Sequence, residues 1–250
     1  MEKTGTYSYH VESFHLDCTE RLSLTVLGNQ LLNAAARHAE ALGYGRETLR
    51  QRGFAWVFSR LAITMDDYPR EFDDYTIRTW VSDVSRFFST RCFAVFDAED
   101  RLLGTARSVW ALLNLESRSA VDIYQTIPTY PDSVNENPLP DRQLVFSAPS
   151  RRVRVASSEP VITFSPLFCD IDYNGHFNSI KYLEHLLDAI PMEDYLAHSV
   201  HTVELAYNSE CRYGDRLAIF ADHPSPLEYA LELRHADGPT ACRCHVIFGS

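Results

Sequence analysis

This chain of 250 residues contains an imperfect internal repeat, in which each half has one helix followed by several strands. Apolar residues recur at helical spacing over residues 22–42 in the first half and 179–190 in the second. Gly43 and Pro191 supply the stop signals. Runs rich in aromatic and β-branched residues predict strands at 54–65, 74–84, 89–97, 102–113, 201–207, 216–220, 228–234 and 241–248. The pattern predicts an α+β protein of two units.

A proline-rich stretch separates the two halves. Residues 129–150 contain four prolines and few apolar residues, which is typical of a semi-rigid linker. We therefore expect an N-terminal unit at 1–128 and a C-terminal unit at 151–250. Two independent domains would also fit this division of the chain. Neither half alone, however, is long enough to bury a large hydrophobic core, so we favour two units that pair.

Composition excludes several classes of protein. A hydrophobic content of 45% is that of a globular chain. The 23 Lys+Arg against 34 Asp+Glu give a net charge of −11, which argues against nucleic acid as a partner. No run approaches the roughly 18 apolar residues of a membrane helix, and the start MEKTGTYSYH shows no secretory signal. Six cysteines without a Cys-x-x-Cys pair favour reduced thiols in a cytoplasmic protein.

Common catalytic and cofactor motifs are absent from the sequence. It has no Gly-x-Ser-x-Gly elbow, no Gly-x-x-x-x-Gly-Lys loop and no Gly-x-Gly-x-x-Gly fingerprint. Cys242, Cys244 and His245 resemble metal ligands, but in a strand the two thiols face one side and the imidazole the other. No complementary His/Cys cluster is apparent in the sequence. We therefore expect neither a metal nor a cofactor.

The segment 170–178 concentrates polar chemistry directly before the second helix. Asp172, Asn174 and His176 alternate, and in extended backbone they would share one side. Helix capping would explain Asn174 or Asn178 alone, but not this alternation. Free N–H groups at a helix N-terminus can polarise a carbonyl, and a carboxylate can fix an imidazole tautomer. The segment is thus a candidate catalytic site.

A second candidate is the pair Glu210 and Cys211, which follows a predicted strand. The ordinary interpretation is a solvated glutamate beside a small core cysteine. The alternative is a general base beside a nucleophilic thiol, and the residues alone leave both open.

These motifs together resemble those of the acyl-acyl-carrier-protein thioesterases of plant plastids and bacteria. The run Asp170-Ile-Asp-x-Asn-x-His-x-Asn-x-x-Lys-Tyr182 is similar to the family's catalytic motif, and Asn208-Ser-Glu-Cys211 resembles its Arg-Arg-Glu-Cys segment. Ala55–Arg60 is similar to the family's Trp-Val-x-Ser-Arg strand. Two departures are Gly175, where the plant enzymes have Gln, and Asn208-Ser209, where they have two arginines.

The resemblance implies two tandem hot-dog folds, each a long helix wrapped by an antiparallel sheet. The first helix begins without a comparable polar motif. We therefore expect the catalytic residues in the second half and the binding site for the acyl chain in the first. There Trp56, Leu31 and Ala35 are the candidate substrate-binding residues.

The resemblance further implies hydrolysis of a fatty acyl thioester with acyl-carrier protein as the leaving thiol. We expect Glu210 to act as general base, and Asn174 and His176 to position the water or the thioester carbonyl. Asp172 is expected to orient Asn174 and His176. In the rival mechanism Cys211 attacks, with His176 as its base. A coenzyme A thioesterase and a non-catalytic acyl-thioester-binding protein are the alternative functions. A homodimer is a further candidate assembly.

Overall fold

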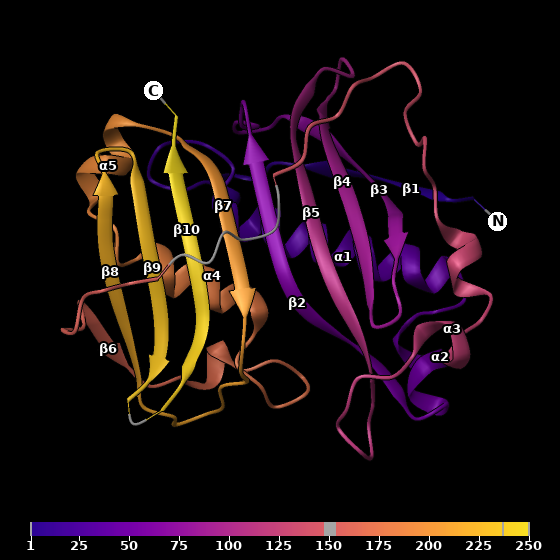
Figure 1. Cartoon of the computed structure of the whole chain (residues 1–250). Helices are drawn as coiled ribbons and strands as arrows, with labels where there is room; N and C mark the ends of the chain where they lie inside the picture. Colours follow the sequence, from indigo (N-terminus) through magenta and orange to yellow (C-terminus); the bar gives the residue numbers. More distant parts are fainter. Residues whose placement is uncertain (1, 148–153, 237, 250) are drawn as a thin grey trace. The chain divides into compact units, whose positions relative to one another are not determined.

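The computed structural model describes residues 2–147, 154–236 and 238–249, and the chain divides into two compact units (Figure 1). The first unit consists of Met1–Ser59 and Met65–Ser147, and the second of Arg60–Thr64 and Ala148–Ser250. Among the described helices, none has the length and apolar character that crossing a membrane requires.

The first unit combines a long helix with an antiparallel sheet. Its helices are α1 (Leu24–Ala41), α2 (Arg46–Gln51) and α3 (Ile123–Thr126), with short 3-10 turns η1 (Ser13–His15) and η2 (Tyr130–Ser133). Its strands are β1 (Thr4–His10), β2 (Phe54–Met65), β3 (Asp74–Val84), β4 (Phe88–Asp97) and β5 (Leu102–Asn114), in the order β1-β3-β4-β5-β2. Helix α1 packs on β1 and β3. The strand β1, which the sequence analysis did not predict, pairs with β3, with Tyr7 opposite Ile77.

Helix α1 begins and ends where its local chemistry requires. The Ser23 side chain accepts a hydrogen bond from the Val26 N–H at 3.2 Å, which caps the N-terminus. Gly43, directly after the C-cap, has a φ of 81°, a conformation that favours glycine. One face of the helix is buried and carries Leu24, Leu27, Leu31, Ala34, Ala35 and His38. The predicted helix is confirmed, with its start moved to Leu24 by the serine cap.

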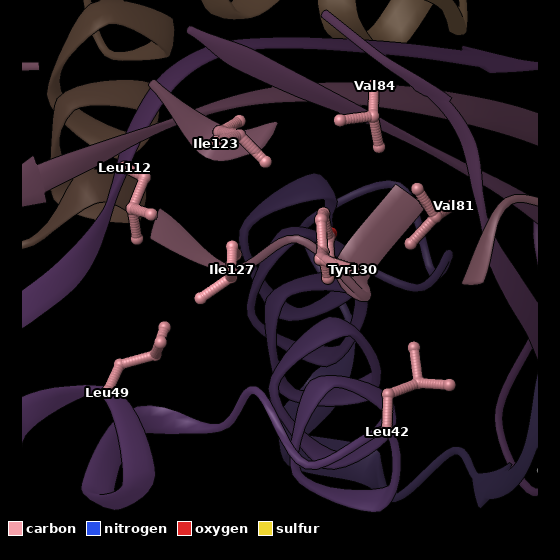
Figure 2. Close-up of a cluster of buried hydrophobic side chains, with 8 residues drawn as sticks. All are labelled: Leu42, Leu49, Val81, Val84, Leu112, Ile123, Ile127 and Tyr130. Carbon is pink, nitrogen blue, oxygen red and sulfur yellow. The ribbon is translucent and has the colours of Figure 1, made fainter. Parts of the chain in front are cut away.

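The core of the first unit includes residues from the stretch that composition marked as a linker. One buried cluster consists of Leu42, Leu49, Val81, Val84, Leu112, Ile123, Ile127 and Tyr130 (Figure 2). Tyr130 is 3% exposed, and its hydroxyl lies 2.8 Å from that of Ser89. Leu139, Leu144 and Phe146 pack on a second cluster around Trp80. Residues 130–147 therefore belong to the first unit, because Tyr130 is buried in its core and three partly buried side chains pack on the cluster around Trp80.

The second unit repeats the arrangement with a shorter helix. Its elements are β6 (Ile162–Phe164), η3 (Phe168–Asp170), α4 (Ser179–Leu187), α5 (Met192–Ala197), β7 (Val200–Tyr207), β8 (Leu217–Ser225), β9 (Glu228–His235) and β10 (Thr240–Phe248). The strand order is β7-β10-β9-β8-β6, and Arg60–Thr64 of β2 pairs antiparallel with β7. Helix α4 packs on β9 and β10. Two helix-and-sheet units of α+β class are therefore present, as expected.

Candidate functional site

The segment before α4 folds as a tight loop. The Gly175 N–H donates to the Asp172 carbonyl at 2.9 Å, and the Asp172 N–H donates to the His176 carbonyl at 2.8 Å. Gly175 has a φ of 80°, which favours glycine at this turn. The backbone is therefore not extended across 172–176, and the predicted one-sided alternation is wrong. Turn-forming Asp, Asn and Gly residues bend the chain here instead.

Asp172 organises this loop through its carboxylate. One oxygen accepts hydrogen bonds from the backbone N–H of Asn174 at 2.8 Å and of His176 at 3.1 Å. The Asn174 side-chain nitrogen lies 3.5 Å from the other oxygen. Asp172 thus fixes the position of His176 through the backbone, and it leaves the Asn174 amide exposed at the loop tip.

Two further contacts attach the loop to its surroundings. The Phe177 N–H donates to the Cys211 carbonyl at 2.7 Å, which joins the loop to the segment after β7. The Asn178 side chain caps α4 by accepting from the Ile180 N–H at 2.8 Å. Capping is therefore the observed role of Asn178. Since this cap occupies the Ile180 N–H, that group is not a free donor for a substrate carbonyl.

His176 and Glu210 lie together at this junction. The imidazole Nε2 is 3.4 Å from Glu210 Oε2, and the two side chains are 26% and 40% exposed. Arg212 Nη2 lies 3.9 Å from the same carboxylate oxygen. The Glu210 carboxylate is thus positioned between an imidazole and a guanidinium, and water can reach it. Arg212 thus places a positive charge near Glu210, whereas Asn208 and Ser209, where the plant enzymes have arginines, carry none.

Cys211 lies next in the chain but in a different environment. It is 0% exposed, and its N–H donates to the Tyr182 hydroxyl at 2.9 Å. Its Sγ is 3.6 Å from His235 Nε2. Burial raises the pKa of the thiol to about 11, although the Tyr182 hydrogen bond opposes this shift. A thiol with this pKa is protonated at neutral pH, which disfavours nucleophilic attack.

Comparison with known proteins decides the family. Residues 2–129 match the acyl-ACP thioesterase N-terminal domain, and residues 156–249 match the acyl-ACP thioesterase C-terminal domain. The chain belongs to the acyl-ACP thioesterase family. The fold is accordingly the double hot-dog, and the predicted class is confirmed.

Solved structures and curated proteins agree with this assignment. An acyl-ACP thioesterase from Bacteroides thetaiotaomicron is 40% identical, covers 99% of this chain and 98% of its own, and has a TM-score of 0.90. The 12:0-ACP thioesterase from Umbellularia californica, at 18% identity, a TM-score of 0.81 and coverage of 100% and 98%, shares the fold. A chloroplastic oleoyl-acyl carrier protein thioesterase from Coriandrum sativum is 23% identical over 82% of this chain. The match spans only 58% of that plant protein's length.

The structure brings together the side chains of four of the five predicted catalytic residues. The side chain of the fifth, Cys211, points toward other groups. Asp172, Asn174, His176 and Glu210 gather around the loop before α4. The Cys211 thiol instead faces His235, whereas the sequence interpretation paired it with His176.

Sequence reasoning did not single out Tyr182, Arg212, Asp215 or His235. Tyr182 is the last residue of the family motif, so a signal for it was present. His235 lies at the end of β9, 24 residues from Cys211, and no sequence motif marks it. Such a contact depends on which strands are neighbours.

The predicted acyl-chain residues all lie inside the first unit. Leu31 and Ala35 are 0% and 4% exposed on the inner face of α1. The Trp56 indole N–H donates to the Tyr44 carbonyl at 3.2 Å, and its ring packs 5.1 Å from that of Tyr130. Trp56 thus borders the cluster of Figure 2. Their role in substrate binding stays a prediction.

Proposed function

We propose that this protein hydrolyses fatty acyl-acyl-carrier-protein thioesters to a free fatty acid and the carrier thiol. Membership of the acyl-ACP thioesterase family supports the reaction class. The contact between His176 and Glu210, with 3.4 Å between Nε2 and Oε2, carries the mechanism, because it provides an oriented carboxylate that water can reach.

In the proposed reaction, Glu210 accepts a proton from a water molecule whose oxygen attacks the thioester carbonyl carbon. The carbonyl becomes a tetrahedral oxyanion, and the exposed Asn174 amide and His176 supply hydrogen bonds to it. The carbon–sulfur bond then breaks, and the departing thiolate takes the proton back from Glu210. Asp172 keeps His176 in place through the loop backbone.

Turnover of site variants tests this mechanism. Glu210→Gln and His176→Ala should each lower the hydrolytic rate by roughly 10²-fold or more, because each removes a group that acts in the transition state. Cys211→Ser should retain most activity. Glu193→Gln, at an exposed position of α5, is the matched control and should behave as the wild type. An acyl group trapped on Cys211, or full activity of Glu210→Gln, would refute the water mechanism.

Matched substrates test the carrier. Acyl-carrier-protein and coenzyme A thioesters from octanoyl to stearoyl would be compared at equal concentration. We expect a higher kcat/KM with the carrier protein. A preference for coenzyme A would make the protein an acyl-CoA thioesterase, and binding without turnover would make it a non-catalytic acyl-thioester-binding protein.

Docking of the carrier needs local positive charge, because the chain has a net charge of −11 and the family resemblance implies an acidic carrier. The densest basic run is Arg151-Arg152-Val153-Arg154. Residues 151–153 lie outside the described part of the chain, and Arg154 is exposed. Replacing Arg151 and Arg152 by glutamate should raise KM for the acyl-carrier protein and leave a small soluble thioester unaffected. The same KM for the carrier substrate in this variant and in the wild type would place the docking surface elsewhere. A cytoplasmic location and a homodimer stay predictions.

A further inference from the structure

A thiol, an imidazole and a carboxylate converge beside the proposed catalytic residues. Cys211 and Asp215 come from the segment between β7 and β8, and His235 ends β9. One ligand atom from each residue lies within 4.8 Å of the others. Sγ of Cys211 is 3.6 Å from Nε2 of His235, and Oδ2 of Asp215 is 3.9 Å from Nδ1 of the same ring. We propose that these three side chains form a binding site for a thiophilic divalent cation, with Zn²⁺ as the best match.

The distance between Cys211 and His235 fits the dimensions of a zinc site. Tetrahedral Zn²⁺ binds a thiolate at about 2.3 Å and an imidazole nitrogen at about 2.0–2.1 Å, which places sulfur and nitrogen roughly 3.6 Å apart. Cys211 and His235 already have this separation. Asp215 Oδ2 lies 3.9 Å from Nδ1, the other nitrogen of the ring, so the Asp215 side chain or the imidazole has to turn before all three groups can bind one ion.

The surroundings hold the ligands and admit an ion. The Cys211 backbone is fixed on both sides, because its N–H donates to the Tyr182 hydroxyl and its carbonyl accepts from Phe177. Asp215 Oδ2 accepts from the Arg212 N–H at 2.8 Å. Cys211 is fully buried, but the His235 and Asp215 side chains are 23% and 35% exposed, so an ion can enter from their side.

The chemistry of the three donors selects among cations. A thiolate with an imidazole favours Zn²⁺ or Co²⁺ over Mg²⁺ or Ca²⁺, which prefer oxygen ligands. Binding releases the thiol proton to solvent and leaves one coordination position for water. The Ser209 hydroxyl also lies near the site, 3.4 Å from His235 Nε2. The site uses neither Glu210 nor His176, so it is separate from the proposed reaction.

Cobalt substitution tests the site without measuring activity. Titration of the full chain with Co²⁺ should produce a near-ultraviolet sulfur-to-cobalt charge-transfer band that saturates at one equivalent, and Zn²⁺ should displace it. Cys211→Ser should abolish the band. His235→Gln and Asp215→Asn should weaken binding by roughly 10- to 100-fold. Circular dichroism would confirm that each variant is folded.

Cys169→Ser is the matched control, because Cys169 is an exposed thiol. Its band should equal that of the wild type. A band that persists in folded Cys211→Ser, or that disappears in Cys169→Ser, would overturn the proposal. So would the absence of a band in the wild type. Should Cys211→Ser fail to fold, unchanged affinity in His235→Gln would overturn it equally, because His235 lies at the accessible edge of the site.

Discussion

Replacing His38 by glutamine should remove a pH-dependent part of the stability of the first unit. His38 lies on the buried face of α1 and is 2% exposed. An Arg91 guanidinium N–H donates to its Nδ1 at 2.7 Å, and its Nε2 lies 3.4 Å from the Glu2 carbonyl. Burial, followed by the positive charge of Arg91, lowers the pKa of His38 to about 4 from its ordinary value of 6.5.

The size of the effect follows from proton linkage. Between these two pKa values the unfolded chain binds a proton that the folded chain excludes, so stability rises with pH. The contribution of His38 is complete above about pH 6.5 and is lost as pH falls toward 4. One pKa unit corresponds to about 1.4 kcal/mol, so lowering the pH from 7.5 to 5.0 should cost about 2 kcal/mol from this residue alone.

Tryptophan fluorescence provides a selective assay. The three tryptophans are Trp56, Trp80 and Trp110, which all lie in the first unit. Urea unfolding followed by this signal at pH 7.5 and pH 5.0 gives the change in unfolding free energy for that unit. Glutamine keeps an acceptor for Arg91 but does not titrate, and the carboxylates titrate alike in both proteins. The wild type should therefore lose about 2 kcal/mol more than His38→Gln.

An equal pH dependence in the two proteins would refute this reasoning. It would mean that His38 accepts a proton in the folded state about as readily as in the unfolded state. Imidazole NMR resonances of the folded protein provide a direct check, and a His38 pKa near 6.5 would contradict the buried, neutral ring.

Three other perturbations follow from the structure. Leu49→Ala should lower the unfolding free energy by about 2–5 kcal/mol in urea titrations, because Leu49 is fully buried in the cluster of Figure 2, and a loss below about 1 kcal/mol would contradict this. Asn178→Ala should cost about 1 kcal/mol through loss of the α4 cap, seen as faster amide exchange in that helix. Trp56→Ala should shift acyl-chain preference toward longer chains and Ala35→Phe toward shorter ones. Unchanged chain-length profiles with retained activity would make these two residues scaffold only.

The local elements could be predicted from the sequence because their signals are local. The apolar spacing that predicted a helix over 22–42 corresponds to Leu24–Ala41, and the aromatic run at 54–65 coincides with β2. The loop before α4 lies within nine consecutive residues, so its polar groups could be recognised together. Short-range contacts of this kind depend mainly on backbone preference and side-chain type.

Only the tertiary structure decided which distant side chains meet. Tyr130 lies in a proline-rich stretch, yet it is buried in the first unit because its ring fills space beside Trp56 and Tyr44. Cys211 faces His235, and Glu210 contacts His176, although Glu210 and Cys211 are adjacent in sequence. The pairing of β9 with β8 places His235, and a register shift of one residue would turn its side chain to the opposite face. The contact between Glu210 and His176 depends instead on how the loop before α4 packs against the segment after β7. Composition and spacing carry no information about either arrangement.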